Sequence, residues 1–121
     1  MRKLFPVTLL LLLAACAAPK PAPDAFDDAE EAIEAAVLAG AEEHSPVELR
    51  FAREKLAEAH TGMEYKQYDK VIYLIEQSEI NSELAIEKTR TAVTRARVAE
   101  STRDYEVLQA DFDATYGEDA Q

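Results

Sequence analysis

Residues 45–63, SPVELRFAREKLAEAHTGM, carry the sharpest local structural signal of the chain and predict a helix over residues 46–61. Ser45 is a favourable N-cap, Pro46 suits the first helical position, and Glu48 would complete a capping box with Ser45. Apolar side chains then recur at three- and four-residue steps, as on the buried face of a helix: Leu49, Ala52, Leu56, Ala59 and Met63. We expect Gly62 to lie near the end of this helix.

The segment before this stretch predicts a shorter helix over residues 24–39, followed by a connection at residues 40–44. Asp24 can act as its N-cap. One face is apolar by the same three- and four-residue spacing, and its members are Phe26, Ala29, Ile33, Ala36, Val37 and Gly40. The rest of the surface is mostly acidic.

The segment after it predicts a long helix over residues 67–116. No glycine occurs between Gly62 and Gly117, and Pro46 is the only proline after residue 23. Fifty helical residues would be about 75 Å long. Its first part has an apolar or small-residue stripe that the two shorter helices can cover: Tyr68, Val71, Ile72, Ile75, Ser78, Ser82 and Ala85. The sequence therefore predicts an all-α domain over residues 24–121, a helical hairpin or three-helix arrangement with a long C-terminal helix.

The far half of this helix carries a second stripe for which the chain offers no obvious cover. It comprises Val98, Thr102, Tyr105, Leu108, Phe112 and Tyr116. Either the helix breaks and folds back, or the stripe meets another chain. We take Val98, Tyr105, Leu108, Phe112 and Tyr116 as a candidate interaction surface.

Charge divides the chain in the same way. The charged side chains of residues 88–103 are all basic except Glu100. Residues 104–121 contain acidic but no basic side chains. The acidic first helix and the basic stretch can pair within one chain or between two chains. Exposed pairs of this kind contribute only about 0–1 kcal/mol each.

The N-terminus has the organisation of an export signal over residues 1–15. Arg2 and Lys3 precede an apolar run from Leu4 to Ala15, and small residues stand at its end. This run is twelve residues long, whereas a membrane-spanning helix needs about 20. An ordinary secretory signal with a chance cysteine is the alternative to a lipoprotein signal.

The sequence Leu13-Ala14-Ala15-Cys16 resembles the lipobox of bacterial lipoproteins. The resemblance implies cleavage between Ala15 and Cys16, and lipid attachment at Cys16. Because Ala17 rather than an aspartate follows, it implies delivery to the outer membrane, facing the periplasm. Each buried CH₂ contributes about 0.8 kcal/mol, so several acyl chains would make the anchor stable. Residues 16–23 would form the lipidated cysteine and an extended Pro/Ala linker.

Half of the chain, about residues 26–86, resembles a family of bacterial envelope lipoproteins known as domain of unknown function 4398. The resemblance is carried by a small-residue turn, a Pro-x-Glu-Leu helix start and later helical positions: Ala39-Gly40-Ala41, Pro46-Val47-Glu48-Leu49, Ala52, Lys55-Leu56, Ala59, Tyr68, Glu76-Gln77 and Glu83-Leu84-Ala85. Val71 and Ile72 depart from the pattern, where a smaller residue is expected. The resemblance implies a periplasm-facing helical lipoprotein, sometimes found next to peptidoglycan-binding outer-membrane proteins, and no known chemistry.

Composition and motifs argue against several classes of function. Without residues 1–15 the chain would have 106 residues, with 11 basic and 24 acidic side chains. Such an acidic body does not suit nucleic acid, which requires a basic surface. His44 and His60 are sixteen residues apart and lack metal-ligand spacing. No catalytic motif is present, so we expect no enzyme activity, no metal and no cofactor.

The sequence thus predicts a lipid-anchored envelope protein with a structural or adaptor role. Its long helix would be presented to an envelope protein or to a second copy. The alternative is a ligand-binding module for an envelope peptide or glycan. Its small groove would lie between the second and third helices, near Leu56, Met63, Tyr68 and Ile75.

Overall fold

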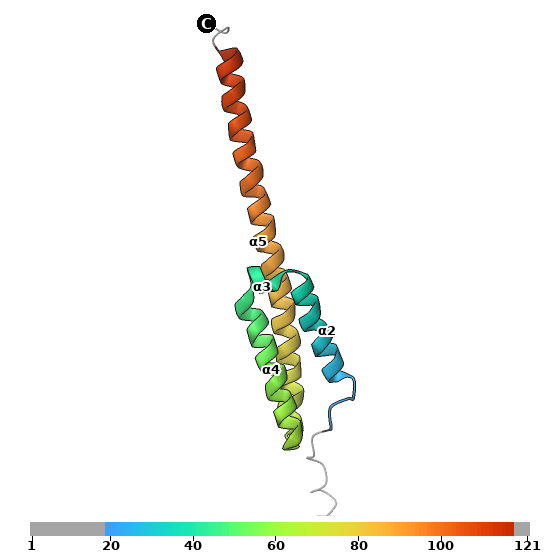
Figure 1. Cartoon of the computed structure of the whole chain (residues 1–121). Coiled ribbons are helices and arrows are strands. Elements are labelled where there is room, and N and C mark those ends of the chain that lie inside the picture. Colours follow the sequence, from blue (N-terminus) through green and yellow to red (C-terminus); the bar gives the residue numbers. More distant parts are fainter. Residues whose placement is uncertain (1–18, 118–121) are drawn as a thin grey trace, which may run out of the picture.

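The computed structural model describes residues 19–117, and all regular structure in that range is helical (Figure 1). The helices are α2 (Ala25–Leu38), α3 (Ala41–His44), α4 (Pro46–Glu64) and α5 (Tyr68–Tyr116). This confirms the predicted all-α fold with a long C-terminal helix. The predicted signal peptide, its cleavage point at Ala15 and the lipidation residue Cys16 lie outside the described residues.

Helices α4 and α5 form an antiparallel hairpin, and α2 packs beside them (Figure 1). Helices α2, α3 and α4 cover only the first half of α5, so the second half projects alone. We call residues 25–93 the bundle and residues 94–116, all of which are exposed, the arm. The arm is therefore about 35 Å long.

The core of the bundle is built from small and medium-sized side chains in two clusters. The first contains Ala29, Leu56, Ala59, Val71, Leu74 and Ile75. The second contains Ala36, Ala41, Leu49 and Ala85. The predicted stripes of all three helices are confirmed in outline, because most of their members are buried or half-buried. The buried residues Leu74 and Thr89 were missed by the predicted stripe of α5.

The predicted capping box at the start of α4 is wrong. Ser45 makes no side-chain bond to its own helix. Its hydroxyl lies 2.7 Å from the carbonyl oxygen of Ala85, to which it donates, and 2.7 Å from the Thr89 hydroxyl. Glu48 instead accepts a hydrogen bond from Lys88. The hydrogen-bond partners of these two side chains lie on the neighbouring helix α5, so a capping rule based on nearby residues does not predict them. Asp24 likewise precedes α2 without a side-chain cap bond.

Two turns differ from the sequence-based expectation. The predicted connection at residues 40–44 contains the single-turn helix α3, which Gly40 introduces with a left-handed backbone (φ +94°). Helix α4 runs to Glu64, beyond the expected end at residue 61. Its C-terminus is closed by two backbone bonds, from Lys66 N–H to Met63 and from Gln67 N–H to Gly62. This is a Schellman motif with Lys66 (φ +56°) in the position usually held by glycine.

Helix α5 is continuous from Tyr68 to Tyr116. Of the two alternatives for the far stripe, a helix that breaks and folds back is therefore excluded. Among residues 19–117 no helix has the length and apolar character needed to cross a bilayer.

Candidate functional site

The predicted interaction surface lies entirely on the arm. Its five residues keep 60–67% of their surface exposed: Val98, Tyr105, Leu108, Phe112 and Tyr116. The Phe112 and Tyr116 rings contact each other, with ring centroids 5.1 Å apart. The structure therefore brings these residues to one exposed helix segment, with no other part of residues 19–117 covering them.

The apolar stripe of the arm lies on a different side of α5 from the stripe that is buried in the bundle. Thr89 ends the buried series, and Val98 follows nine residues later, about two and a half helical turns. Val98 therefore points to the side of the helix opposite Thr89. Extending α2 or α4 along α5 would not cover Val98, Tyr105 and Phe112.

The arm is divided into a basic and an acidic part. Residues 94–103 contain three arginines and one glutamate, whereas residues 104–116 contain four acidic and no basic side chains. The bundle has seven basic and sixteen acidic side chains, a net charge of −9. Within residues 19–117, no ion pair links the acidic helix α2 to the predicted basic stretch 88–103: Lys88 pairs with Glu48 on α4, and Arg90 pairs with Glu87 on α5.

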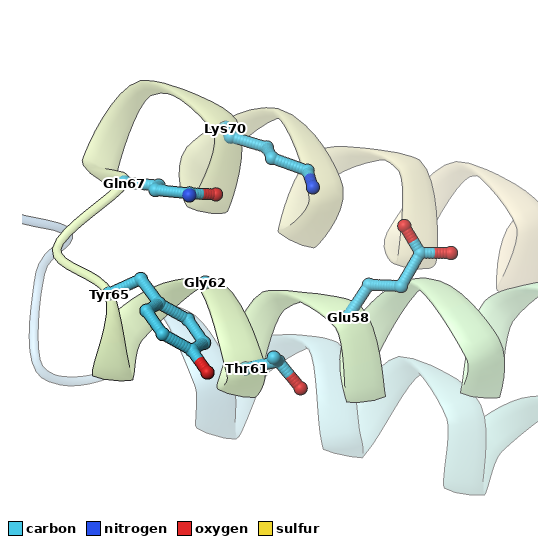
Figure 2. A pocket seen from close by; sticks show the side chains of 6 residues that line it. All are labelled: Glu58, Thr61, Gly62, Tyr65, Gln67 and Lys70. Atoms are coloured by element: carbon cyan, nitrogen blue, oxygen red, sulfur yellow. The ribbon is translucent and has the colours of Figure 1, made fainter.

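A hollow of about 300 Å³ lies at the closed end of the α4–α5 hairpin (Figure 2). Its lining side chains are mostly exposed: Glu58, Thr61, Gly62, Tyr65, Gln67 and Lys70. Lys55 donates a hydrogen bond to Glu58 (2.8 Å), and this bond, aided by the charge of Lys70, lowers the pKa of the Glu58 carboxyl. Figure 2 shows the Lys70 amino group directed toward Glu58. The carboxylate of Glu58 at this hollow is thus already paired with a lysine of its own helix.

A second hollow, of about 370 Å³, forms where the linker meets α2 and α5. Asp28, Glu76 and Glu79 line it together with Lys20 and apolar side chains. Glu79 is half-buried, and its burial, reinforced by the charges of Asp28, Glu76 and Glu83, raises the pKa of its carboxyl. It is the one carboxylate among the described residues whose pKa is shifted upward, and sequence spacing gave no sign of it.

The groove predicted between the second and third helices is filled by side chains. Leu56 and Ile75 are 7% and 4% exposed and belong to the same core cluster, against which Met63 also packs. Tyr68 is half-buried at the start of α5. Leu56, Ile75 and Met63 therefore contribute to the core of the hairpin, and their side chains fill the place of the predicted groove.

The two histidines take separate structural roles. His60 stacks on Phe26 with ring centroids 4.4 Å apart, and its Nε2 lies 3.9 Å from a carboxylate oxygen of Glu30. His44 is exposed on α3. In the described part of the chain, no three His, Cys, Asp or Glu side chains are grouped so that they could hold a metal ion.

The described part of the linker enters the bundle at the end opposite the arm. Residues 19–23 lead into the start of α2, near the α4–α5 turn, while the arm leaves from the other end (Figure 1). Pro21 is buried against the domain. An attachment point before residue 19 would therefore be separated from the arm by the length of the bundle.

Comparison with known proteins identifies one match. A family model described as "Domain of unknown function (DUF4398)" matches residues 24–101, which include the bundle and the beginning of the arm. No curated protein and no solved structure matches the chain.

Proposed function

The chain belongs to the DUF4398 family, and from this premise we propose that it is a lipid-anchored protein of the bacterial cell envelope that presents its arm to a protein partner. The observation that carries the proposal is the exposed apolar stripe of the arm. A monomeric helix with apolar residues on one side normally buries them against another element. Here nothing in residues 19–117 does so.

The proposed anchor is a lipid on Cys16, with cleavage between Ala15 and Cys16. Its support is the short apolar run, the small residues before Cys16 and the proline-containing linker that follows. Ala17 favours the outer membrane, with the domain facing the periplasm. The linker enters the bundle at the end far from the arm (Figure 1). The arm of an anchored molecule would then extend away from its attachment point.

The proposed role is structural rather than catalytic. In the hairpin hollow Glu58 is already paired with Lys55, and the predicted groove is occupied by the core. Ligand sites are usually concave, largely apolar and enclose most of the ligand. The arm is the opposite kind of surface, because it is convex and suits contact with another helix.

The anchor is tested by comparing the full chain with Cys16→Ala in a Gram-negative host. We expect the native chain to sediment with membranes, to require detergent for release and to incorporate a labelled fatty acid, and Cys16→Ala to incorporate none. Ala17→Asp is the matched control, since it should keep the lipid but change the membrane in which the protein is found. Absence of the label from the native chain, or equal labelling of Cys16→Ala, would contradict the anchor.

The presenting role is tested by placing a photo-crosslinking amino acid along the arm in cells. We expect adducts from positions 105 and 112 and none from position 107. Val107 is 69% exposed but lies on the other side of the helix from Val98, so it is a matched control. Equal capture from all three positions, or from none, would overturn the proposal that the stripe is a specific docking surface.

A further inference from the structure

The arm has the spacing of a coiled-coil seam. Val98, Tyr105 and Phe112 are seven residues apart, and Leu108 follows Tyr105 by three. These are the a and d positions of a heptad repeat, where two helices interlock their side chains. Most helical stability in proteins comes from the packing of an apolar face. A second helix along this seam would supply that packing.

The charge pattern of the arm selects the direction of such a helix. Three arginines lie before residue 104, and four acidic side chains lie after residue 103. An identical arm running antiparallel would place each basic part beside an acidic part. With the two arms fully overlapped, the second copy's Tyr105 would lie at the level of Tyr105 along the axis, and its Phe112 at the level of Val98. Arg97 would lie beside Asp111 and Asp113.

A parallel arrangement would be opposed twice. The basic parts of the two arms would lie at the same level, and so would the acidic parts, which brings like charges together. The two bundles, each with a net charge of −9, would also lie side by side. An antiparallel arrangement holds the bundles at opposite ends of the paired arms.

We propose that the partner of the arm is the arm of a second copy of this chain, paired antiparallel along the seam of Val98, Tyr105, Leu108 and Phe112. This inference rests on the proposed presenting role and names its partner. The two linkers would leave the dimer at opposite ends, because each linker enters its bundle far from the arm (Figure 1). Both anchors could reach one membrane only if the dimer lay along its surface.

The direction of pairing is tested with cysteines added to the full-length chain and produced in cells. Val98→Cys and Phe112→Cys are made in separate chains of different size and produced together. A disulfide needs Cα atoms about 4.4–6.8 Å apart. We expect a mixed Val98→Cys/Phe112→Cys disulfide and none between two Val98→Cys chains, whose Cα atoms would be about 21 Å apart along the axis. The chain without an added cysteine controls for disulfides through Cys16.

The charge argument is tested in the same cysteine background. Arg95→Glu/Arg97→Glu would face acidic side chains, and we expect about tenfold less mixed disulfide. Asp111→Lys/Asp113→Lys would face arginines and should lower the yield in the same way. All four changes together restore opposite charges, so the yield should return to within about twofold of the unmodified arm. A yield that the four-residue swap does not restore would overturn the antiparallel pairing.

The other outcomes separate this inference from the proposed function. Disulfides between two Val98→Cys chains would indicate a parallel pair and overturn the antiparallel arrangement. Capture of the acidic α2 surface of a second copy, or of a different polypeptide, would overturn arm-to-arm pairing and leave the presenting role intact. If no arm position is captured by anything, both proposals fail.

Discussion

Ser45 illustrates how one side chain can be assigned a plausible but wrong role. Its position before Pro46 is typical of an N-cap, yet its hydroxyl bonds to Ala85 and Thr89 on α5, forty or more residues away. Both hydroxyl groups are buried, and each serves as the partner of the other. The residue joins two helices and does not close the end of one.

This assignment predicts the effect of removing either hydroxyl. Ser45→Ala should lower the free energy of unfolding by about 1–3 kcal/mol, because it leaves the Thr89 hydroxyl without its buried partner. Thr89→Val should also be destabilising, and the double variant should lose less than the sum of the two. Urea unfolding of the four chains measures this. If the two losses are additive, the hydroxyl pair does not contribute to stability; Thr91→Val, exposed on the bundle part of α5, is the control.

Glu79 predicts a pH-dependent stability. Its pKa is raised above the ordinary 4.5 by burial and by nearby carboxylates, so the folded state holds the proton more tightly than the unfolded state. The favourable contribution is therefore complete below pH 4.5 and is lost as the pH rises through the folded pKa. Glu79→Gln should raise the melting temperature at pH 7 and leave it unchanged near pH 3. An equal gain at both pH values, or the same gain from the exposed Glu31→Gln, would contradict this origin.

At the scale of the element, the α4–α5 hairpin depends on two residues at its closed end. Lys66 takes a left-handed conformation that an L-residue adopts only at some cost. Gly62 lies where α4 approaches α5, and a Cβ added there would stand 2.9 Å from Cγ2 of Val71. The predicted helix end near Gly62 reflected glycine's usual place at C-termini, but here glycine provides space and lysine makes the turn.

The turn predicts a stabilising substitution. Lys66→Gly should raise the free energy of unfolding by about 1 kcal/mol, because glycine adopts positive φ without a Cβ penalty. Lys66→Ala is the matched control, since it removes the same charge but keeps the Cβ. Thermal unfolding should show a gain for Lys66→Gly alone. Equal gains from both variants would attribute the effect to charge.

The close approach of α4 and α5 at Gly62 predicts that the effect of Gly62→Ala on stability changes sign when Val71 is replaced by alanine. Gly62→Ala should be destabilising by about 1–3 kcal/mol from overpacking against the buried, stiff Val71, partly offset by about 1 kcal/mol of helix propensity. In a Val71→Ala background the clash is gone, so the same substitution should become stabilising. Urea unfolding of the four chains tests this. Gly117→Ala, with open space around its Cβ, should have little effect.

At the scale of the whole molecule, the bundle and the arm differ in burial and in charge. The bundle has a core and a strong negative charge, whereas the arm has no buried residue and charges of both signs. The bundle contains all the buried apolar side chains of α2 to α5. It should therefore fold without the arm.

A chain ending at Val93 tests this division. We expect its melting temperature to lie within about 3 °C of the full domain at low protein concentration, because no buried residue is lost. Circular dichroism should show less helix, corresponding to the absent arm. If the shortened chain unfolds, the arm contributes to the bundle in a way that its exposure does not reveal.

The sequence alone determined the three longer helices and which side of each of them is apolar. Spacing of apolar residues and the absence of Gly and Pro are local properties, so they predicted the helices, the long α5 and the five residues of the candidate site. They also placed Leu49, Leu56 and Val71 in the core, although they missed Leu74 and Thr89.

Only the tertiary structure decided how these segments use their neighbours. It showed that α5 is continuous, that Val98 points away from the side on which Thr89 is buried, and that core side chains fill the place of the predicted groove. It also directed Ser45 and Glu48 to α5. The physical reason is that hydrogen-bond partners and exposed faces depend on residues forty positions away, whereas helical periodicity depends on residues three and four positions away.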